Sequence, residues 1–325
     1  MDDAVSRSPI SVASRVLEYF IAIAELGSVS RAAMRLGITQ PALSRQIKRL
    51  EEQLGVPMLE RHWRGVRLTP AGERLYQEAS SLQRQFQQLC AELADGGGSP
   101  SGSVTIAVTP SAGDLLVPEL IARYRALYPL VRVVIRQGYS EAVEQMLEEG
   151  HADFALFPTY PGARPPSANL LTQPLVRERE LLAGPGDPPL QARYTFVELV
   201  ELPLIVPARG NGLRQLLETV AADRRLTLAP IAEIDGMTLI KALVRRGLGC
   251  TILPLHAMQP EMGAGYLQAA EIVEPALERV YVTAWHATRA LPRAAGAIAP
   301  LVPIVVNEMV ATGAWPNAEM LAPQR

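Results

Sequence analysis

Residues 39–54 combine base-reading side chains with the spacing of an amphipathic helix. Apolar residues recur at intervals of four, three and four, at Leu43, Ile47, Leu50 and Leu54. This spacing puts them on one helical face. The opposite face carries Gln40, Pro41, Ser44, Arg45, Lys48 and Arg49. In the major groove of DNA, Arg pairs with guanine, Gln with adenine, and Ser with bases or phosphates. The pattern predicts a helix that reads a DNA groove with its polar face.

Two shorter helices precede this segment and would hold it in place. The first runs from about Ala13 to Leu26 and can end at Gly27. Ser28 or Ser30 then caps a second helix, which buries small alanines and breaks at Gly37. Thr39 is placed to cap the third helix, so the three helices form a helix-turn-helix pattern.

A hairpin and a long helix follow. Two short extended pieces flank Arg64-Gly65, the pattern of a hairpin wing. Thr69 and Pro70 then open a helix with a heptad seam at Leu75, Ala79, Leu82, Phe86, Leu89 and Leu93. The seam fits either packing on its own domain or a two-chain coiled coil. We favour the coiled coil, because the glycine-rich hinge at 96–102 leaves the helix little of its own chain to contact.

Charge is unevenly distributed in a chain of 325 residues, 48% of them hydrophobic and 20% charged. Its net charge is −2, yet residues 28–67 hold eight basic residues and three acidic ones. Such local positive charge around a helix-turn-helix suits phosphate binding. Arg49 and Arg61 fit equally well as solvated or ion-paired residues.

After the hinge, the pattern changes to alternating strands and helices. Strands are expected at 104–108, 131–136 and 153–157, with helices at 115–128 and 142–149 between them. This βαβαβ order predicts a mostly parallel sheet. Later segments repeat the style, at Leu204–Pro207, Gly212–Asp223, Pro230–Asp235, Met237–Arg246 and Cys250–Leu253, with a further strand at Tyr281–Trp285. The tail beyond Thr312 has no such pattern and is expected to be unstructured.

Enzyme chemistry finds little support in the sequence. The histidines, His62, His151, His256 and His286, have no metal-ligand spacing. There is no nucleophile elbow and no P-loop, and the two cysteines cannot form a disulfide framework. The N-terminal residues lack the apolar core of a signal peptide. We expect no cofactor and no metal, and we expect a cytoplasmic location.

The stretch from "LEYFIAIAELGSVSRAAMRLGITQPALSRQ" to "RLTPAGERL" resembles the N-terminal module of LysR-type transcriptional regulators. Later segments, such as "ALVRRGLGCTILP", resemble that family's co-inducer domain. The resemblance implies an α/β multidomain chain: a winged helix-turn-helix, a dimerising linker helix and a two-lobed effector domain like the periplasmic binding proteins. The implied boundaries are a flexible tail at 1–12, the DNA-binding domain at 13–69, the linker helix at 70–95, the hinge at 96–102, lobe I at 103–178 and 281–312, lobe II at 179–280, and a tail at 313–325.

The same resemblance assigns roles to DNA-binding residues. Base reading falls to Gln40, Pro41, Ser44 and Arg45, with Lys48 on the same face. Ser28, Ser30 and Arg31 are expected to meet phosphates at the start of the second helix. Arg64 and Arg67 on the wing are expected to approach the minor groove or its phosphates.

Effector contacts are expected where strands end, since parallel α/β folds bind ligands there. Thr109 and Ser111 follow the first strand at a helix N-terminus, where an anion is well placed. Thr159 follows another strand and is expected to face the same cleft. In the second lobe the candidates are Arg209, Asn211 and Thr238. Arg209 fits a carboxylate clamp or a solvated loop, while Asn211 and Thr238 also fit helix caps. The implied ligand is small, polar and anionic.

The sequence therefore predicts a DNA-binding regulator that responds to a metabolite. Its expected partners are promoter or operator DNA, a small-molecule effector, RNA polymerase and further copies of itself, as a homodimer or homotetramer, with no membrane. The alternative is a solute receptor for transport, which the helix-turn-helix and the missing signal peptide oppose.

Overall fold

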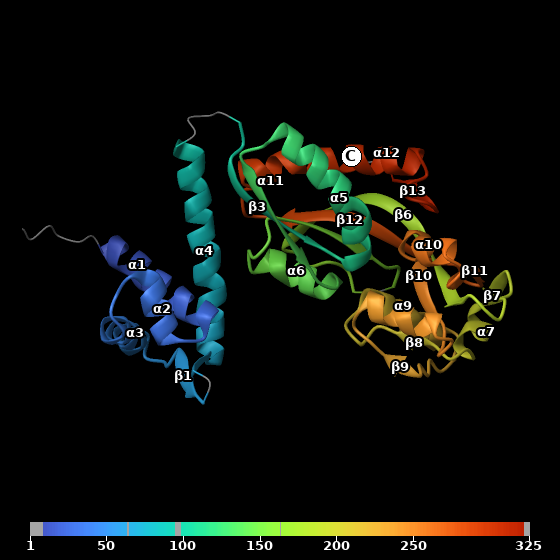
Figure 1. Ribbon diagram of the computed structural model, residues 1–325, viewed down its shortest axis with the longest axis horizontal. Helices are drawn as coiled ribbons and strands as arrows, with labels where there is room; N and C mark the ends of the chain where they lie inside the picture. Colours follow the sequence, from blue (N-terminus) through green and yellow to red (C-terminus); the bar gives the residue numbers. More distant parts are fainter. Residues whose placement is uncertain (1–8, 64, 95–98, 163, 322–325) are drawn as a thin grey trace, which may run out of the picture. The chain divides into compact units, whose positions relative to one another are not determined.

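A computed structural model describes residues 9–63, 65–94, 99–162 and 164–321. The chain forms two compact units, one built from residues up to Ala94 and the other from most of the chain after it. Each unit has hydrophobic cores of its own. We describe the units separately (Figure 1).

The first unit is a helix-turn-helix with a hairpin and a long helix. Its elements in chain order are α1 (Pro9–Leu26), α2 (Val29–Leu36), α3 (Gln40–Leu54), β1 (Leu59–His62), β2 (Gly65–Leu68) and α4 (Pro70–Ala94). Its core contains Phe20 and Ile23 of α1, Leu43 and Ile47 of α3, and the small residues Ala32 and Ala33 of α2. The predicted order of elements is confirmed, although α1 begins at Pro9 rather than near Ala13.

The helix ends largely follow the predicted caps. Ser28 Oγ accepts a hydrogen bond from the Arg31 N–H at 3.3 Å, and Gly37 ends α2 with a left-handed φ of 66°. Thr39 occupies the N-cap position of α3 in an extended conformation, but its side chain makes no capping hydrogen bond. Leu54, on the predicted apolar face, is 49% exposed, so the core does not cover that face in the last turn of α3.

The hairpin pairs β1 with β2 antiparallel, from Leu59 opposite Leu68 to His62 opposite Gly65. Thr69 joins it to α4: its hydroxyl donates to the Pro57 carbonyl at 2.7 Å and accepts from the Gly72 N–H at 3.0 Å. A Cβ at Gly72 would lie 2.0 Å from the Met58 carbonyl oxygen, so this junction has no room for a side chain. The predicted wing is confirmed, and Arg64 lies outside the described residues.

The heptad seam of α4 is only partly covered within its own unit. Ala79 is buried and Leu75 half-buried, whereas Leu82 and Phe86 are 60% and 64% exposed. The side chains of Leu89 and Leu93, and residues 96–98 of the predicted hinge, lie outside the described residues. An uncovered apolar seam is what a helix awaiting a partner would show.

The second unit is built on one large mixed sheet. Among the described residues it has nine strands, in the order β4-β3-β5-β12-β6-β11-β7, with β10 and β13 also pairing with β6. Their bounds are β3 (Gly102–Val108), β4 (Val131–Gln137), β5 (Phe154–Thr159), β6 (Leu170–Pro185), β7 (Arg193–Thr195), β10 (Thr251–Pro254), β11 (Leu267–Val273), β12 (Leu277–His286) and β13 (Ala318–Met320). A separate parallel pair joins β8 (Ile205–Val206) to β9 (Ala232–Glu233).

The prediction of a mostly parallel sheet is right only for its beginning. β3 pairs in parallel with β4 and β5. β6 then pairs antiparallel with β10, β11, β12 and β13. The error arose at β6, whose 16 residues carry charges at several positions and do not look like a buried strand.

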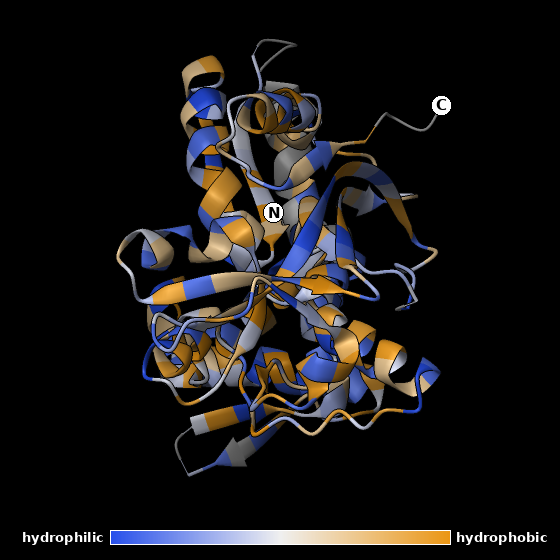
Figure 2. Cartoon of the chain, turned by 90° about the vertical axis from the view of Figure 1, so that its right-hand side faces the viewer, coloured by the Kyte–Doolittle hydropathy of each residue, from blue (hydrophilic) through white to orange (hydrophobic). Residues whose placement is uncertain are grey.

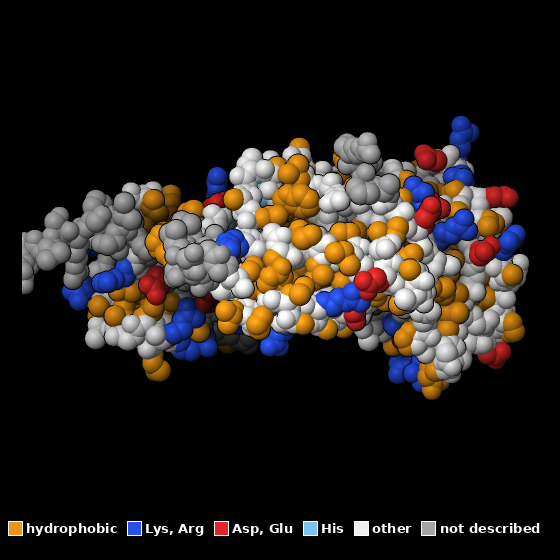
Figure 3. Space-filling model, turned by 90° about the horizontal axis from the view of Figure 1, so that it is seen from above, with side chains coloured by type: hydrophobic (Ala, Val, Ile, Leu, Met, Phe, Trp, Pro, Cys, Tyr) orange, Lys and Arg blue, Asp and Glu red, His pale blue; other side chains and the backbone are white. Residues whose placement is uncertain are grey.

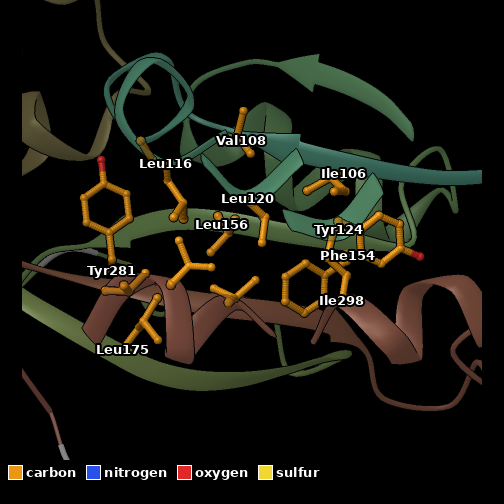
Figure 4. Packing of buried hydrophobic residues seen from close by; sticks show 14 of the residues in the cluster. Ile106, Val108, Leu116, Leu120, Tyr124, Phe154, Leu156, Leu175, Tyr281 and Ile298 are labelled. Carbon is orange, nitrogen blue, oxygen red and sulfur yellow. The ribbon is translucent and has the colours of Figure 1, made fainter. Parts of the chain in front are cut away.

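Helices pack against the strands in both lobes. The helices are α5 (Pro110–Leu127), α6 (Ser140–Glu148), α7 (Phe196–Val200), α8 (Gly212–Asp223), α9 (Met237–Arg245), α10 (Leu255–Gly263), α11 (Arg293–Ile298) and α12 (Leu301–Ala311). One core joins Ile106, Leu120 and Ile298 between the sheet and α5 and α11 (Figure 4). A second joins Leu182, Leu217 and Ile252 in the other lobe. The long strand β6 contributes residues to both.

One stretch of the described residues, Arg293–Ala311, has the length and mean hydropathy of a membrane-spanning helix. In this fold it consists of α11 and α12, which bury Ile298, Val302 and Val305 in the core of lobe I. Seen from above, hydrophobic and uncharged side chains predominate over the middle of the picture (Figure 3). Arg123 of α5 pairs with Glu308 of α12 at 2.5 Å.

The C-terminal segment is structured, so the prediction of an unstructured tail is wrong up to Leu321. β13 pairs with β6 from Ala318 opposite Glu178 to Met320 opposite Val176. Trp315 is 1% exposed and packs edge-on against Tyr281 and His256. Three residues are too short for a strand signal, and one tryptophan is too little for a periodic pattern.

Candidate nucleic-acid interface and ligand cavity

The polar face of α3 is exposed, as the sequence predicts. Leu43 and Ile47 are 0% and 4% exposed and belong to the core, which fixes the direction of the opposite face. That face presents Gln40, Pro41, Ser44, Arg45, Lys48 and Arg49. An open hollow beside it is lined by Arg45, Lys48 and Arg49. The result is a convex, cationic helix surface of the kind that a major groove accepts.

Local contacts hold several of these side chains in place. Ser30 Oγ donates to Gln40 Oε1 at 3.1 Å, a contact that uses the amide oxygen and not the N–H donors of Gln40. Arg45 Nε donates to the Pro41 carbonyl at 3.3 Å. Lys48 lies 3.8 Å from Glu52, a weak exposed pair. The arrangement pre-positions donors for base edges on the first turns of α3.

The start of α2 is more structural than predicted. Ser28 caps the helix, and an Arg31 guanidinium nitrogen donates to the Leu26 carbonyl. Arg31 is exposed even so, so it can also face a phosphate. On the wing, Arg67 is exposed on β2 opposite Glu60. Sequence reasoning passed over Trp63, which is 77% exposed near the tip of this hairpin.

The second unit contains a cavity of about 70 Å³ that residues of both lobes line. Of the six predicted effector residues, Ser111 and Asn211 reach it. The polar and aromatic lining comes mainly from Tyr139, Tyr160, Glu180 and Arg279, which the sequence reasoning missed. Leu213, Met237 and Ile240 form part of its apolar wall.

The other predicted effector residues lie elsewhere. Thr109 is 4% exposed at the N-cap position of α5 without capping it. Thr159 donates to the Val280 carbonyl at 3.1 Å and lines a separate small hollow. The Arg209 side chain is 81% exposed and lies 3.5 Å from Glu218. Thr238 is exposed on α9. Asn211 also caps α8, because its side-chain oxygen accepts from the Leu213 N–H at 2.9 Å.

A buried ion cluster forms one side of the cavity. Arg279 donates from Nε to Glu178 Oε1 at 2.7 Å, and its Nη1 lies 3.2 Å from Glu180 Oε1. Glu178 Oε2 accepts from the Trp315 indole N–H at 2.9 Å and lies 3.1 Å from His256 Nδ1. Ser111 Oγ and Tyr281 Oη are 2.7 Å apart. These contacts tie the cavity wall to the C-terminal segment.

The two carboxyl groups of this cluster have opposite pKa shifts. Burial acts to raise the pKa of Glu178, but Arg279, His256 and the Trp315 N–H outweigh it and lower that pKa to about 2. At Glu180, burial raises the pKa, and the counteracting charge of Arg279 does not cancel that effect. The ionised form of Glu178 is therefore stabilised, whereas burial disfavours the ionised form of Glu180.

The missed residues leave a faint signal in the sequence. Residues 177–180 read Arg-Glu-Arg-Glu, and Glu278-Arg279 lies on the neighbouring strand. Alternate positions of a strand face opposite sides of the sheet, so half of this charge run must point inward once both faces are covered. Hydrophilic segments interrupt the hydrophobic ones along the strands of this unit (Figure 2).

Comparisons with known proteins agree with this architecture. Residues 14–73 match the family model of the bacterial regulatory helix-turn-helix protein, lysR family, and residues 97–302 match the LysR substrate binding domain. The chain belongs to the LysR family of transcriptional regulators. It is therefore a DNA-binding regulator with an effector-binding domain, rather than an enzyme or a transport receptor.

Individual relatives cover nearly the whole chain. The HTH-type transcriptional regulator BbuR of Bordetella bronchiseptica is 30% identical over 93% of this chain and 92% of its own length. The nitrogen assimilation regulatory protein nac of Klebsiella aerogenes is 32% identical over 81% of this chain and 85% of its own. Full-length OxyR from Pseudomonas aeruginosa superposes with a TM-score of 0.67 at 26% identity, covering 90% of this chain and 97% of that one.

A further solved structure supports the fold alone. Full-length CbnR, solved in complex with its target DNA, has a TM-score of 0.66 at 19% identity. It covers 90% of this chain and 99% of that one.

Proposed function

We propose that this regulator reads its operator with the exposed face of α3. The observation that carries the proposal is the division of that helix: Leu43 and Ile47 are buried in the core, while Gln40, Ser44 and Arg45 are exposed together. Since Leu43 and Ile47 fix which side of the helix faces the core, the opposite, polar side is available for base edges. Lys48, Arg67 and Arg31 would add sequence-independent phosphate contacts.

The regulatory part of the proposal concerns the cavity between the lobes. A ligand bound there can act only by favouring one arrangement of lobes or subunits over another. Two copies joined through α4 would place two recognition helices on a dyad-symmetric site, and pairs of dimers would form tetramers. We further propose a cytoplasmic location, where promoter DNA and RNA polymerase are accessible.

Replacing Arg45 tests base reading. In Arg45→Ala we expect the ratio of operator to random-DNA affinity to fall about tenfold to a hundredfold, because one bidentate base contact is worth about 1–3 kcal/mol. Gel-shift competition with the genomic fragment that binds wild type most tightly gives this ratio. Affinity should also decrease steeply with salt for both proteins.

Arg15→Ala is the matched control, since it removes an exposed arginine of α1 outside the proposed surface. Its operator preference should equal that of wild type. If Arg45→Ala weakened operator and random DNA by the same factor, Arg45 would be a phosphate contact and the base-reading assignment would be wrong.

A further inference from the structure

One side chain that lines the cavity between the lobes has a buried carboxylate oxygen without a partner among the described residues. Glu180 is 1% exposed and lines the cavity. Its Oε1 atom lies 3.2 Å from Arg279 Nη1 and accepts from the Tyr160 hydroxyl at 3.4 Å. Its Oε2 atom is buried and has no hydrogen-bond partner among the described residues. A buried carboxylate oxygen left unpaired is costly, so a ligand that supplies a donor here would be favoured.

The guanidinium of Arg279, which lines the cavity, already contacts two carboxyl groups. Arg279 lies 2.6 Å from Glu178 through Nη2 and 3.2 Å from Glu180 through Nη1, and its Nη2 also donates to Ser111 Oγ at 3.4 Å. Two carboxyl groups thus share one cation. An anion placed against Arg279 would also meet Glu180, so like-charge repulsion and desolvation would oppose its binding. The expected anion clamp, Arg209, does not line the cavity.

The remaining walls suit a cation with a short apolar body. Tyr139 and Tyr160 both line the cavity, and aromatic side chains attract ammonium groups through their π-faces. Leu213, Met237 and Ile240 supply apolar contact. A cavity of about 70 Å³ admits a ligand group of only a few heavy atoms.

We propose that the effector presents a primary ammonium group on a short apolar chain to this cavity, with Glu180 Oε2 as its acceptor and Tyr139 and Tyr160 as its aromatic walls. The assignment rests on the proposed regulatory role of the cavity and replaces the expected anionic ligand with a cationic one. It follows from the geometry of this chain: a free acceptor, an occupied guanidinium and two tyrosines.

Three probes with the same carbon skeleton test the charge preference: n-butylammonium, butanamide and butanoate. Each is titrated into the full-length protein at constant ionic strength, with the apparent unfolding temperature and the heat of binding as readouts. A ligand that binds only the folded state raises apparent stability by mass action. We expect n-butylammonium to bind about tenfold or more tightly than butanoate, because charge-assisted hydrogen bonds exceed neutral ones. Equal or tighter binding of butanoate, or no binding by any probe, would overturn the proposal.

Two variants locate the probe. Glu180→Gln should weaken n-butylammonium about tenfold or more, and Tyr139→Leu should weaken it while keeping the carboxylate, which covers the case that the first variant does not fold. Glu278→Gln, at a partly exposed carboxylate of β12 that does not line the cavity, is the control and should bind n-butylammonium as wild type does. If Glu180→Gln and Glu278→Gln bound it alike, the site would be wrong. Operator affinity without any probe, measured by gel shift, tests the DNA-binding proposal separately.

Discussion

Neighbouring glutamates on β6 show how much a single residue's surroundings decide. Glu178 and Glu180 are each 1% exposed and share Arg279, yet only Glu178 also meets Trp315 and His256. The additional donors lower the pKa of Glu178 to about 2, whereas burial prevails at Glu180 and raises its pKa. Glu178 therefore stabilises the fold through its buried contacts, whereas Glu180 lines the cavity.

Glu178→Gln should lower the free energy of unfolding by about 3–5 kcal/mol at neutral pH, because it breaks a buried ion pair. Urea denaturation provides the measurement. The folded-state pKa of Glu178 lies below the ordinary carboxyl value of 4.5. Its contribution to stability is therefore complete above about pH 4.5 and is lost as the pH falls toward about 2. The difference between wild type and variant should shrink over that interval.

Glu278→Gln is the matched control at this scale. Glu278 pairs with Arg177 and Arg179 at 3.8 Å on the exposed side of the same strands. Exposed pairs contribute about 0–1 kcal/mol, so this variant should unfold close to wild type at every pH. Equal losses in the two variants would mean that the buried side of the strand has no special role.

At the residue scale, sequence reasoning succeeded on the DNA side and failed in the cavity. The exposure of Gln40, Ser44 and Arg45 follows from local spacing alone, because one helix decides it. The contact of Glu180 with Arg279 joins residues 99 positions apart, and no local pattern encodes that distance. Arg209 and Thr238 failed for the same reason: a loop position after a strand does not fix where its side chain points.

Elements with a strong internal period were predicted well. The helix at Gly212–Asp223 has the predicted bounds, with Asn211 as its cap. β7, α7, α10 and β11 were missed, as was β6, whose alternating charges are usual for a solvated surface. Most consequential was the C-terminal segment, where β13 and Trp315 complete the sheet and the ion cluster.

Trp315→Ala should destabilise the protein by about 3–5 kcal/mol, because it removes a buried aromatic side chain and the indole donor to Glu178. Chemical denaturation followed by circular dichroism measures the loss. Ile304→Ala, at a 52% exposed position of α12, is the control and should shift the midpoint far less, because little of that side chain is buried. Wild-type stability in Trp315→Ala would show that Trp315 does not contribute to the free energy of unfolding.

For the whole molecule, the exposed seam of α4 predicts assembly. Leu82 and Phe86 lie one helical turn apart, are more than half exposed and continue the seam of Leu75 and Ala79, so they form one exposed apolar stripe. The order of domains could be predicted from sequence because the hinge and the change from helical to mixed patterning are local signals. The sheet order could not, because β6 pairs with four other strands along its length.

The double variant Leu82→Asn with Phe86→Asn should dissociate into monomers in sedimentation velocity. Each lost side chain is worth about 1.5–3 kcal/mol of burial and a symmetric dimer loses four of them, so dimer dissociation should become about ten-thousandfold more favourable or more. Operator affinity should fall with it, because two linked recognition helices bind far better than one. Val197→Asn, at a 52% exposed position of α7, should change neither property. A variant that remained dimeric would exclude α4 as the interface.

The two-sided charge pattern of β6 also limits how this protein can change its length. Removing one residue before Arg177 would shift the strand by one position and turn Arg177 and Arg179 inward, against Arg279. Three guanidinium groups would then crowd a space that now holds one, with both glutamates displaced into water. Insertions and deletions in β6 should therefore prevent folding, whereas those at the wing tip or in the hinge should be tolerated. Strand β6 is accordingly a poor junction for chimeric regulators.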